Sequence, residues 1–240
     1  MTTTTPLSAV VMAAGLGTRM RSATPKHLHS LPGRRLVDLV VEAVRPLAPD
    51  PFVLVTSPDA EGALVDIEGT SVVVQHPARG TGDAVATARA ALGSGKRDVL
   101  VLSGDTPLLT SALLDALVEH HRATAASVTV LSLRPPDAGA YGRVIRDGAG
   151  RLGAIVEAKD ASTDELAVDE VNSSIYVFAS DALWPAVDAL DPHNAQGELY
   201  LTDCVRHIVN AGGAGAVLAA PSWESAVGVN TRVELAGVAA

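Results

Sequence analysis

The sequence contains a single cysteine, Cys204, so the chain cannot form an internal disulfide. Lysine is also scarce and occurs only as Lys26, Lys96 and Lys159. No apolar run reaches the roughly 18 residues of a membrane-spanning helix, and the first residues carry neither basic charge nor a hydrophobic signal segment. We therefore expect a cytoplasmic protein that binds no membrane, with Cys204 as a small buried hydrophobe.

The balance of charge argues against another class of partner. The chain has 18 basic and 27 acidic residues among 240, which gives a formal net charge of −9. Nucleic acids and anionic membranes attract basic surfaces, so we expect no nucleic-acid partner. Apolar residues make up 48% of the chain, enough for the sizeable core of an α/β domain.

The first half of the chain alternates between strand-like apolar runs and helix-like segments. Four such alternations over roughly 130 residues are typical of a mostly parallel central sheet with helices on both faces. The expected strands are 10–14, 52–56, 71–75, 98–103 and 127–133, and the expected helices are 36–47, 59–66, 81–92 and 111–121.

The second half is less regular. A glycine-rich turn at 147–150 predicts a hairpin between 142–146 and 152–157. The remaining expectations are a polar loop at 160–169, a strand at 171–179, helices at 181–190 and 198–210, and short edge strands at 216–219 and 226–229.

The loop after the first strand carries the clearest chemical signal. Gly15 and Gly17 allow a tight turn that brings backbone amides close to a ligand, and Arg19 and Lys26 follow. Amide donors and two cations suit a phosphate-rich ligand. The loop is not a Walker A motif, because no Gly-Lys-Ser or Gly-Lys-Thr closes it, and Met20 stands where a dinucleotide fingerprint has its third glycine. For the two glycines alone, an ordinary strand-to-loop turn is the alternative.

Three other positions carry possible chemistry, each beside a plainer structural explanation. Asp105 follows Ser103-Gly104 at the end of a buried strand and suits a carboxylate that binds Mg²⁺, or it caps a turn. Gln75, at another strand end, has an amide that can recognise a base, or it is a surface glutamine. Gly80-Thr81-Gly82 offers amide donors at a helix start, or simply begins the helix.

A series of motifs runs from residue 7 to about residue 234, namely AAGLGTRM, PKHLH, GTGDA, GDTPLL, YGRV, IVEAKDA, EVNSSIYVF, NAQGELYLTD and GVNTR. In this order they resemble the uridyltransferase domain of the bacterial bifunctional N-acetylglucosamine-1-phosphate uridyltransferases. NAQGELYLTD and IVEAKDA are the most discriminating of these motifs. The cytidylyltransferases of isoprenoid synthesis and the molybdenum-cofactor guanylyltransferases share the first loop but lack the later motifs.

The resemblance implies a Rossmann-like nucleotidyltransferase fold with a smaller β-rich substrate-binding part. It also implies an enzyme that uses Mg²⁺ to make UDP-N-acetylglucosamine, a cell-wall precursor, and pyrophosphate from UTP and N-acetylglucosamine 1-phosphate. By motif match, Arg19 and Lys26 hold the triphosphate as catalytic residues. The nucleotide-binding positions are Ala14, Gly15, Gly17, Thr18, Gln75, Gly80, Thr81 and Gly82, the sugar-binding positions are Ser103, Gly142, Glu157 and Asn172, and the metal ligands are Asp105 and Asn230.

The sequence departs from the family pattern at Leu16, Ala78, Ser103 and Ser173-Ser174. These positions touch both the base pocket and the sugar pocket, so the same chemistry on another sugar phosphate or nucleotide is an alternative. A non-catalytic nucleotide-sugar sensor is the alternative from another class. A sensor does not need a complete metal and pyrophosphate apparatus, which argues against it.

The family continues into a left-handed β-helix of hexapeptide repeats, which binds acetyl-CoA and forms trimers, and no such repeat occurs before Ala240. We therefore expect no acetyl-CoA site and a monomer or weak oligomer, either a natural single-domain enzyme or part of a longer chain. Residues 1–6 are expected to be a disordered lead. Residues 7–240 are expected to form one domain, with its nucleotide-binding half at about 7–108 and its sugar-binding half at about 109–240.

Overall fold

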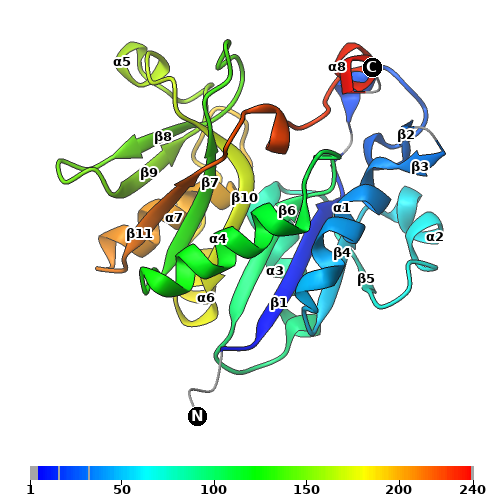
Figure 1. Ribbon diagram of the computed structural model, residues 1–240, viewed down its shortest axis with the longest axis horizontal. Coiled ribbons are helices and arrows are strands. Elements are labelled where there is room, and N and C mark those ends of the chain that lie inside the picture. The colour runs from blue at the N-terminus through cyan, green and yellow to red at the C-terminus, as the bar shows by residue number, and fades with distance from the viewer. Residues whose placement is uncertain (1–4, 16, 32, 239–240) are drawn as a thin grey trace.

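One nine-stranded sheet runs through the chain, in the order β11-β7-β10-β6-β1-β4-β5, with β8 and β9 attached beside β10 (Figure 1). The computed structural model describes residues 5–15, 17–31 and 33–238. The strands are β1 (Leu7–Ala13), β4 (Phe52–Thr56), β5 (Ser71–Val74), β6 (Asp98–Ser103), β7 (Val128–Leu133), β8 (Arg143–Arg146), β9 (Leu152–Val156), β10 (Val171–Ala179) and β11 (Gly215–Ala219).

Most neighbouring strands along the main path from β11 to β5 are parallel. β1 pairs in parallel with β4 and β6, β4 with β5, and β7 with β11. β10 is the exception on this path, because it runs antiparallel to both β6 and β7, and the attached β8 and β9 are also antiparallel to each other. The expected α/β fold with a mostly parallel sheet is confirmed. The reversed direction of β10 places its first residues at the edge where β1 and β6 end.

Helices cover both faces of the sheet. The face toward the viewer in Figure 1 carries α1 (Leu36–Val44) and α4 (Ser111–Ala123). The far face carries α3 (Thr81–Leu92), α6 (Ser180–Asp188) and α7 (Leu201–Asn210). Alternate residues of each strand enter the two cores: in β1, Val10 and Met12 pack with the far helices, and Ala9 and Val11 with the near ones.

The shorter elements lie mainly at the edges. They are β2 (Ser30–Leu31), β3 (Arg34–Arg35), α2 (Glu61–Leu64), α5 (Thr163–Leu166), α8 (Arg232–Val238) and the 3₁₀ helices η1 (Thr18–Met20), η2 (Lys26–Leu28), η3 (Arg45–Leu47), η4 (Pro58–Ala60) and η5 (Glu224–Ala226). None of the helices within the described ranges is long and apolar enough to cross a membrane.

Three local predictions for the second half were wrong. The expected loop at 160–169 contains α5, because Ser162 and Glu165 form a capping box that starts a helical turn. The expected strand at 226–229 is replaced by η5 and an extended segment, and its apolar Val229 packs with Leu31 and Leu36. The helix expected at 198–210 begins only at Leu201.

The structure bears on the expected N-terminal lead and on Cys204. Residues 1–4 of the expected lead lie outside the described residues, whereas the carbonyls of Thr5 and Pro6 accept hydrogen bonds from Arg122 and from the Asp98 backbone. Cys204 is fully buried, and this burial raises the pKa of its thiol to about 12. The expectation that Cys204 is a small core hydrophobe is therefore confirmed.

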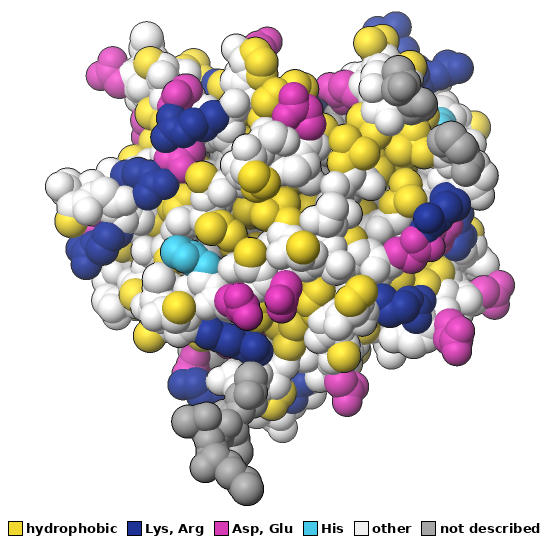
Figure 2. Space-filling model, viewed as in Figure 1, with side chains coloured by type: hydrophobic (Ala, Val, Ile, Leu, Met, Phe, Trp, Pro, Cys, Tyr) yellow, Lys and Arg dark blue, Asp and Glu magenta, His cyan; other side chains and the backbone are white. Residues whose placement is uncertain are grey.

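The face that carries α1 and α4 shows no large patch of one charge. Figure 2 shows basic and acidic side chains scattered around the rim of this face, often side by side, with apolar atoms between them. One basic and acidic pair in α1 and the residue before it is Arg35 with Asp38, in which Nη2 of Arg35 lies 2.7 Å from Oδ1 of Asp38.

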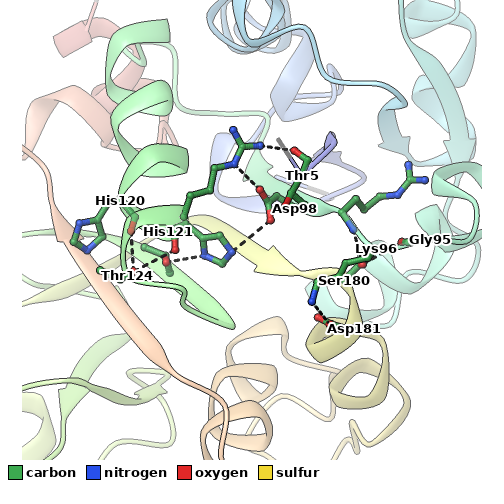
Figure 3. A network of polar contacts seen from close by, with 12 residues as sticks. Thr5, Gly95, Lys96, Asp98, His120, His121, Thr124, Ser180 and Asp181 are labelled. Atoms are coloured by element: carbon green, nitrogen blue, oxygen red, sulfur yellow. Dashed lines mark hydrogen bonds and ion pairs between the residues drawn. The ribbon is translucent and has the colours of Figure 1, made fainter. Parts of the chain in front are cut away.

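A buried polar network fixes the amino-terminal edge of the sheet, opposite the glycine loop (Figure 3). Asp98, at the start of β6, accepts a hydrogen bond of 2.7 Å from Nε of Arg122 at the end of α4. The neighbouring His121 shares a hydrogen bond of 2.9 Å between its Nδ1 and the hydroxyl of Thr129 in β7. The network therefore joins α4 to two strands.

The buried His121 predicts a loss of stability in mild acid. Burial lowers the pKa of His121 below 6.5, with the nearby charges of Arg122 and His120 adding to this effect and Asp98 opposing it. Below pH 6.5 the unfolded chain therefore binds a proton that the folded chain refuses, so the free energy of unfolding falls as the pH falls towards the folded-state pKa. Urea unfolding at pH 7.5 and pH 5.5 should show a smaller difference in H121N than in the wild type. H193Q, which changes an exposed histidine, should keep the wild-type difference.

Candidate active site

Parallel strands bring the predicted site residues to one edge of the sheet. β1, β4, β5 and β6 all run in the same direction, so their carboxyl ends meet at the upper edge in Figure 1. The glycine loop follows β1, Gln75 follows β5, and Asp105 lies two residues after β6. This is the edge at which open α/β sheets bind ligands.

A cavity of about 480 Å³ opens at this edge. Its volume falls in the range of small-molecule sites. Most of the predicted triphosphate and nucleotide positions line it, together with one predicted metal ligand. These residues are Ala14, Gly15, Gly17, Thr18, Arg19, Lys26, Gln75, Gly80, Thr81 and Asn230, and they are joined by Met12, Ala78, Ala84 and Glu198.

The charged groups at one end of the cavity contact one another. The Lys26 ammonium forms a short ion pair with Oδ2 of Asp105 and also donates to Oδ1 of Asn230 at 3.1 Å. Arg19 donates from its guanidinium to the same Asn230 oxygen at 3.0 Å. Residues more than 200 positions apart in sequence are thereby joined around one point.

The Asp105 carboxylate is ionised although it is buried. Only 4% of the residue is exposed. Burial by itself raises the pKa of Asp105, but the positive charge and hydrogen bond of Lys26 outweigh it, with a further hydrogen bond from Ser103, so that the net pKa lies below its usual value. Ser103 therefore contacts the carboxylate of Asp105.

Gly17 controls where Lys26 lies. Its φ of +59° is in the left-handed region, and a Cβ added there would lie 2.5 Å from Cβ of Lys26. No side chain fits at that distance without moving the backbone of one of the two segments. The glycine thus lets the loop and η2 pack closely enough for Arg19 and Lys26 to reach Asn230 together.

We expect G17A to lower kcat/KM for pyrophosphate release by on the order of 10-fold or more, because it displaces Lys26 from its partners. G150A is a matched control, since Gly150 has a φ of +78° but open space around it. Both variants carry similar backbone strain, and only G17A adds a clash at the site. Activity and melting temperature should be measured for both variants. Equal activity of G17A and G150A would contradict a positioning role for Gly17.

Gln75 lines the same cavity and is only 4% exposed, so it is not an ordinary surface glutamine. Its amide nitrogen donates to the Gly80 carbonyl at 3.0 Å and to the Asp83 carboxylate at 2.7 Å. The Gly80 carbonyl and the Asp83 carboxylate have no proton to donate, so the Gln75 side chain must turn its NH₂ group, and not its oxygen, toward them. Among the described residues the Gln75 carbonyl oxygen accepts no hydrogen bond, which leaves it available to a donor on a ligand.

The Gly80-Thr81-Gly82 segment is partly occupied by contacts with the stretch before α7. The Gly82 amide donates to the Leu199 carbonyl at 2.8 Å, and the Thr81 hydroxyl accepts from the Leu201 amide at 3.0 Å. A Cβ on Gly80 would lie 2.6 Å from the Leu199 carbonyl oxygen. These glycines therefore permit close packing of α3 against that stretch, in addition to exposing Gly80 and Thr81 to the cavity.

Three of the four predicted sugar-binding residues form a second cluster. A Cβ on Gly142 would lie 3.4 Å from Oε2 of Glu157. The Gly142 carbonyl accepts a hydrogen bond of 2.9 Å from the backbone N–H of Asn172. Glu157 accepts a hydrogen bond from Thr202 at 3.0 Å, and burial raises the pKa of Glu157 above its usual value. Ser103, the fourth predicted residue, lies with Asp105 instead.

Several basic side chains lie beside the first cavity. A second cavity shares Thr18 and Arg19 with it and is also lined by Arg21 and Arg232. Three arginines around one opening give a local positive field despite the net charge of −9.

Residues 9–211 match the family described as the MobA-like NTP transferase domain. The chain belongs to this family. It is 42% identical over 230 residues to a protein named bifunctional protein GlmU from Exiguobacterium sibiricum, with 95% of this chain and 51% of that protein covered. It is 45% identical to bifunctional protein GlmU of Bifidobacterium longum subsp. infantis, with 96% and 52% covered. The kinship indicated by the motifs is therefore confirmed, and the chain spans about half the length of these curated relatives.

A solved structure from Bacillus anthracis shares the fold. It is described as a putative glucose-1-phosphate thymidylyltransferase in complex with a sucrose, and it superimposes with a TM-score of 0.80 at 18% identity. The match covers 97% of this chain and 94% of that one. At this identity the match shows that the two chains share a fold.

The sequence analysis did not single out several residues of this nucleotidyltransferase site. Tyr141 lies near Gly228 and Asp105, and its pKa is raised mainly by burial. Glu198 lines the first cavity, and Thr202 supports Glu157. All three lie in or beside the motifs YGRV and NAQGELYLTD, which were the only available signal. Their contacts depend on pairings between distant segments and could not be read from the motifs alone.

Proposed function

We propose that the protein transfers a uridylyl group from UTP to N-acetylglucosamine 1-phosphate, releasing UDP-N-acetylglucosamine and pyrophosphate. The observation that carries this proposal is that a fixed amide acceptor, Gln75, and two cations, Arg19 and Lys26, line the same cavity. The motifs of the uridyltransferase family and relatives named GlmU support the same activity.

The base end favours uracil or thymine over cytosine. Ring position 3 of uracil and thymine carries an N–H donor, whereas the same position of cytosine is an acceptor. The Gln75 carbonyl oxygen can accept only from the former, because its amide nitrogen is held by Asp83 and Gly80. A site built for one donor rejects a base that places an acceptor there, since two acceptors would then face each other without a proton.

The phosphate end suits direct transfer. The phosphate oxygen of the sugar phosphate attacks the α-phosphorus, the bond to the β-phosphate breaks, and its electrons leave with pyrophosphate. No covalent enzyme intermediate is needed, so the protein mainly orients two anions and offsets their repulsion. Arg19 is permanently protonated and fork-shaped, which suits the charge that grows on the departing pyrophosphate.

Asp105 and Asn230 have the donor types of a magnesium site. A carboxylate and an amide oxygen are hard ligands, and in this structure both contact the ammonium of Lys26, a cation that stands between them. Among the described residues no group of three or more His, Cys, Asp or Glu side chains could hold a metal ion, so an ion at this place would need substrate phosphates or water as further ligands. When bound there, Mg²⁺ would lower the negative charge around the α-phosphate.

The second cluster would hold the sugar. Glu157 and the Asn172 side chain provide acceptors for hydroxyl groups, and Gly142 leaves room beside Glu157. Asn172 is held by Tyr176, whose hydroxyl accepts from its side-chain nitrogen at 2.7 Å. This support fixes the Asn172 oxygen, which also accepts from the Ser174 amide at 3.0 Å.

A pyrophosphate-release assay tests the proposal. UTP, dTTP, CTP, ATP and GTP should be paired with the 1-phosphates of N-acetylglucosamine, glucose and galactosamine, with and without Mg²⁺. We expect metal-dependent turnover mainly with UTP and N-acetylglucosamine 1-phosphate. Turnover of another pair would keep the reaction class and replace the substrates. Nucleotide binding in a calorimeter without pyrophosphate release from any pair would favour a sensor.

A further inference from the structure

His27 is a buried side chain that the proposed reaction does not use. It lies in η2 beside Lys26 and is 3% exposed. Neither of its ring nitrogens has a hydrogen-bond partner among the described residues. Burial, helped by the charge of Lys26, lowers the pKa of His27 to about 4, although the Asp105 carboxylate and the nearby Gly104 backbone both oppose this shift, so the ring is neutral at pH 7.

The ring lies between the two loops that build the phosphate end of the cavity. A Cβ on Gly15, in the glycine loop, would lie 3.7 Å from Nε2 of His27. A Cβ on Gly104, which precedes Asp105, would lie 3.3 Å from Nδ1. One nitrogen therefore faces each loop at close range.

An unpartnered imidazole is costly in such a place. A neutral imidazole has one donor and one acceptor, and both lose their water on burial without gaining a partner. A leucine of similar size would fill the space without that cost. The ring lies between two loops of the site and has two nitrogens without partners. This suggests that the two nitrogens form hydrogen bonds in another state of the site.

We propose that His27 is a positioning residue that joins the glycine loop to the Asp105 loop when nucleotide is bound, with one ring nitrogen hydrogen-bonded to the backbone of each loop. This inference rests on the proposed nucleotidyltransferase function. Because Gly15 lines the nucleotide cavity, a bound nucleotide would lie against the residue that Nε2 of His27 faces.

The role predicts opposite effects on stability and activity. We expect H27L to keep or raise the melting temperature, because it removes two unpartnered nitrogens. The same variant should raise KM for the nucleotide by on the order of 10-fold, because the loops are no longer held together, and leave KM for the sugar phosphate unchanged. H27N, which keeps a donor and an acceptor, should recover part of the loss. These assays use the nucleotide that the wild type turns over in the substrate screen. The test of His27 therefore remains valid even if that nucleotide is not UTP.

A second measurement does not depend on any variant. In protein labelled with ¹⁵N in its histidines, addition of UTP, or of the nucleotide found in the substrate screen, should shift the His27 ring resonances to those of a single hydrogen-bonded tautomer. Wild-type resonances that do not move on nucleotide binding would overturn the proposal. So would an H27L variant with unchanged kinetics, or one whose activity falls only in step with its stability and is not rescued by H27N.

Discussion

Replacing Asp105 with asparagine is expected to lower kcat by on the order of 10³ and to remove most of the dependence on Mg²⁺. Asparagine has nearly the same shape, so the change removes charge rather than volume. The pKa of Asp105 lies below its usual value because Lys26 outweighs the effect of burial, and the side chain is therefore a carboxylate at neutral pH. The variant loses a hard anionic ligand and replaces the ion pair of Lys26 with, at most, a hydrogen bond to a neutral amide oxygen.

The measurement is kcat across a Mg²⁺ titration, with the melting temperature recorded alongside. Asp98 offers a matched control, because it is also a buried carboxylate paired with a basic side chain, but at the opposite edge of the sheet. D98N should lose stability through its contact with Arg122 and keep its turnover and metal response. If D105N retained more than a tenth of the activity with an unchanged metal titration, Asp105 would have no role in metal binding.

The elements with clear physical signals could be predicted from the sequence. The bounds expected for 52–56, 81–92, 98–103 and 171–179 agree with β4, α3, β6 and β10. Buried strands of a parallel sheet form continuous apolar runs, and turn residues bound them. The segment 226–229 is equally apolar but forms no strand, because Val229 is buried beside Leu31 and Leu36 rather than in the sheet. Hydrophobicity indicates burial and does not specify which neighbour provides it.

The residues of the site likewise divide into those whose place the sequence could predict and those whose place it could not. Alternation of strands and helices implies a parallel sheet, and this places the glycine loop, Gln75 and Asp105 at one edge. The pairing of β10 with β8 could not be deduced in this way, since strand pairing is a long-range property, and it is this pairing that brings Asn172 beside Gly142. Local pattern also gave no hint that Asp83 fixes the Gln75 amide, because the two meet only when α3 folds back against β5.

Replacing Arg19 with alanine is expected to lower kcat by on the order of 10² to 10³, the cost of losing one donor to the transition state. Arg19 lines the cavity and donates to Asn230, so its guanidinium lies at the phosphate end beside Lys26. The charge that it meets grows as pyrophosphate leaves, so the loss should appear mainly in kcat rather than in KM for the nucleotide. Single-turnover and steady-state assays with the wild-type substrates measure this difference.

Two further variants separate the geometry of Arg19 from its charge. R19K keeps a positive charge but replaces the planar fork with a single ammonium, so it should restore only part of the activity. R206A removes an arginine from α7, where Arg206 pairs with Asp203, and should leave kcat near the wild-type value. An R19A variant that lost less than about threefold in kcat could not have lost a transition-state contact, because one such donor accounts for at least 10². Lys26 and the loop amides would then have to stabilise the leaving pyrophosphate without it.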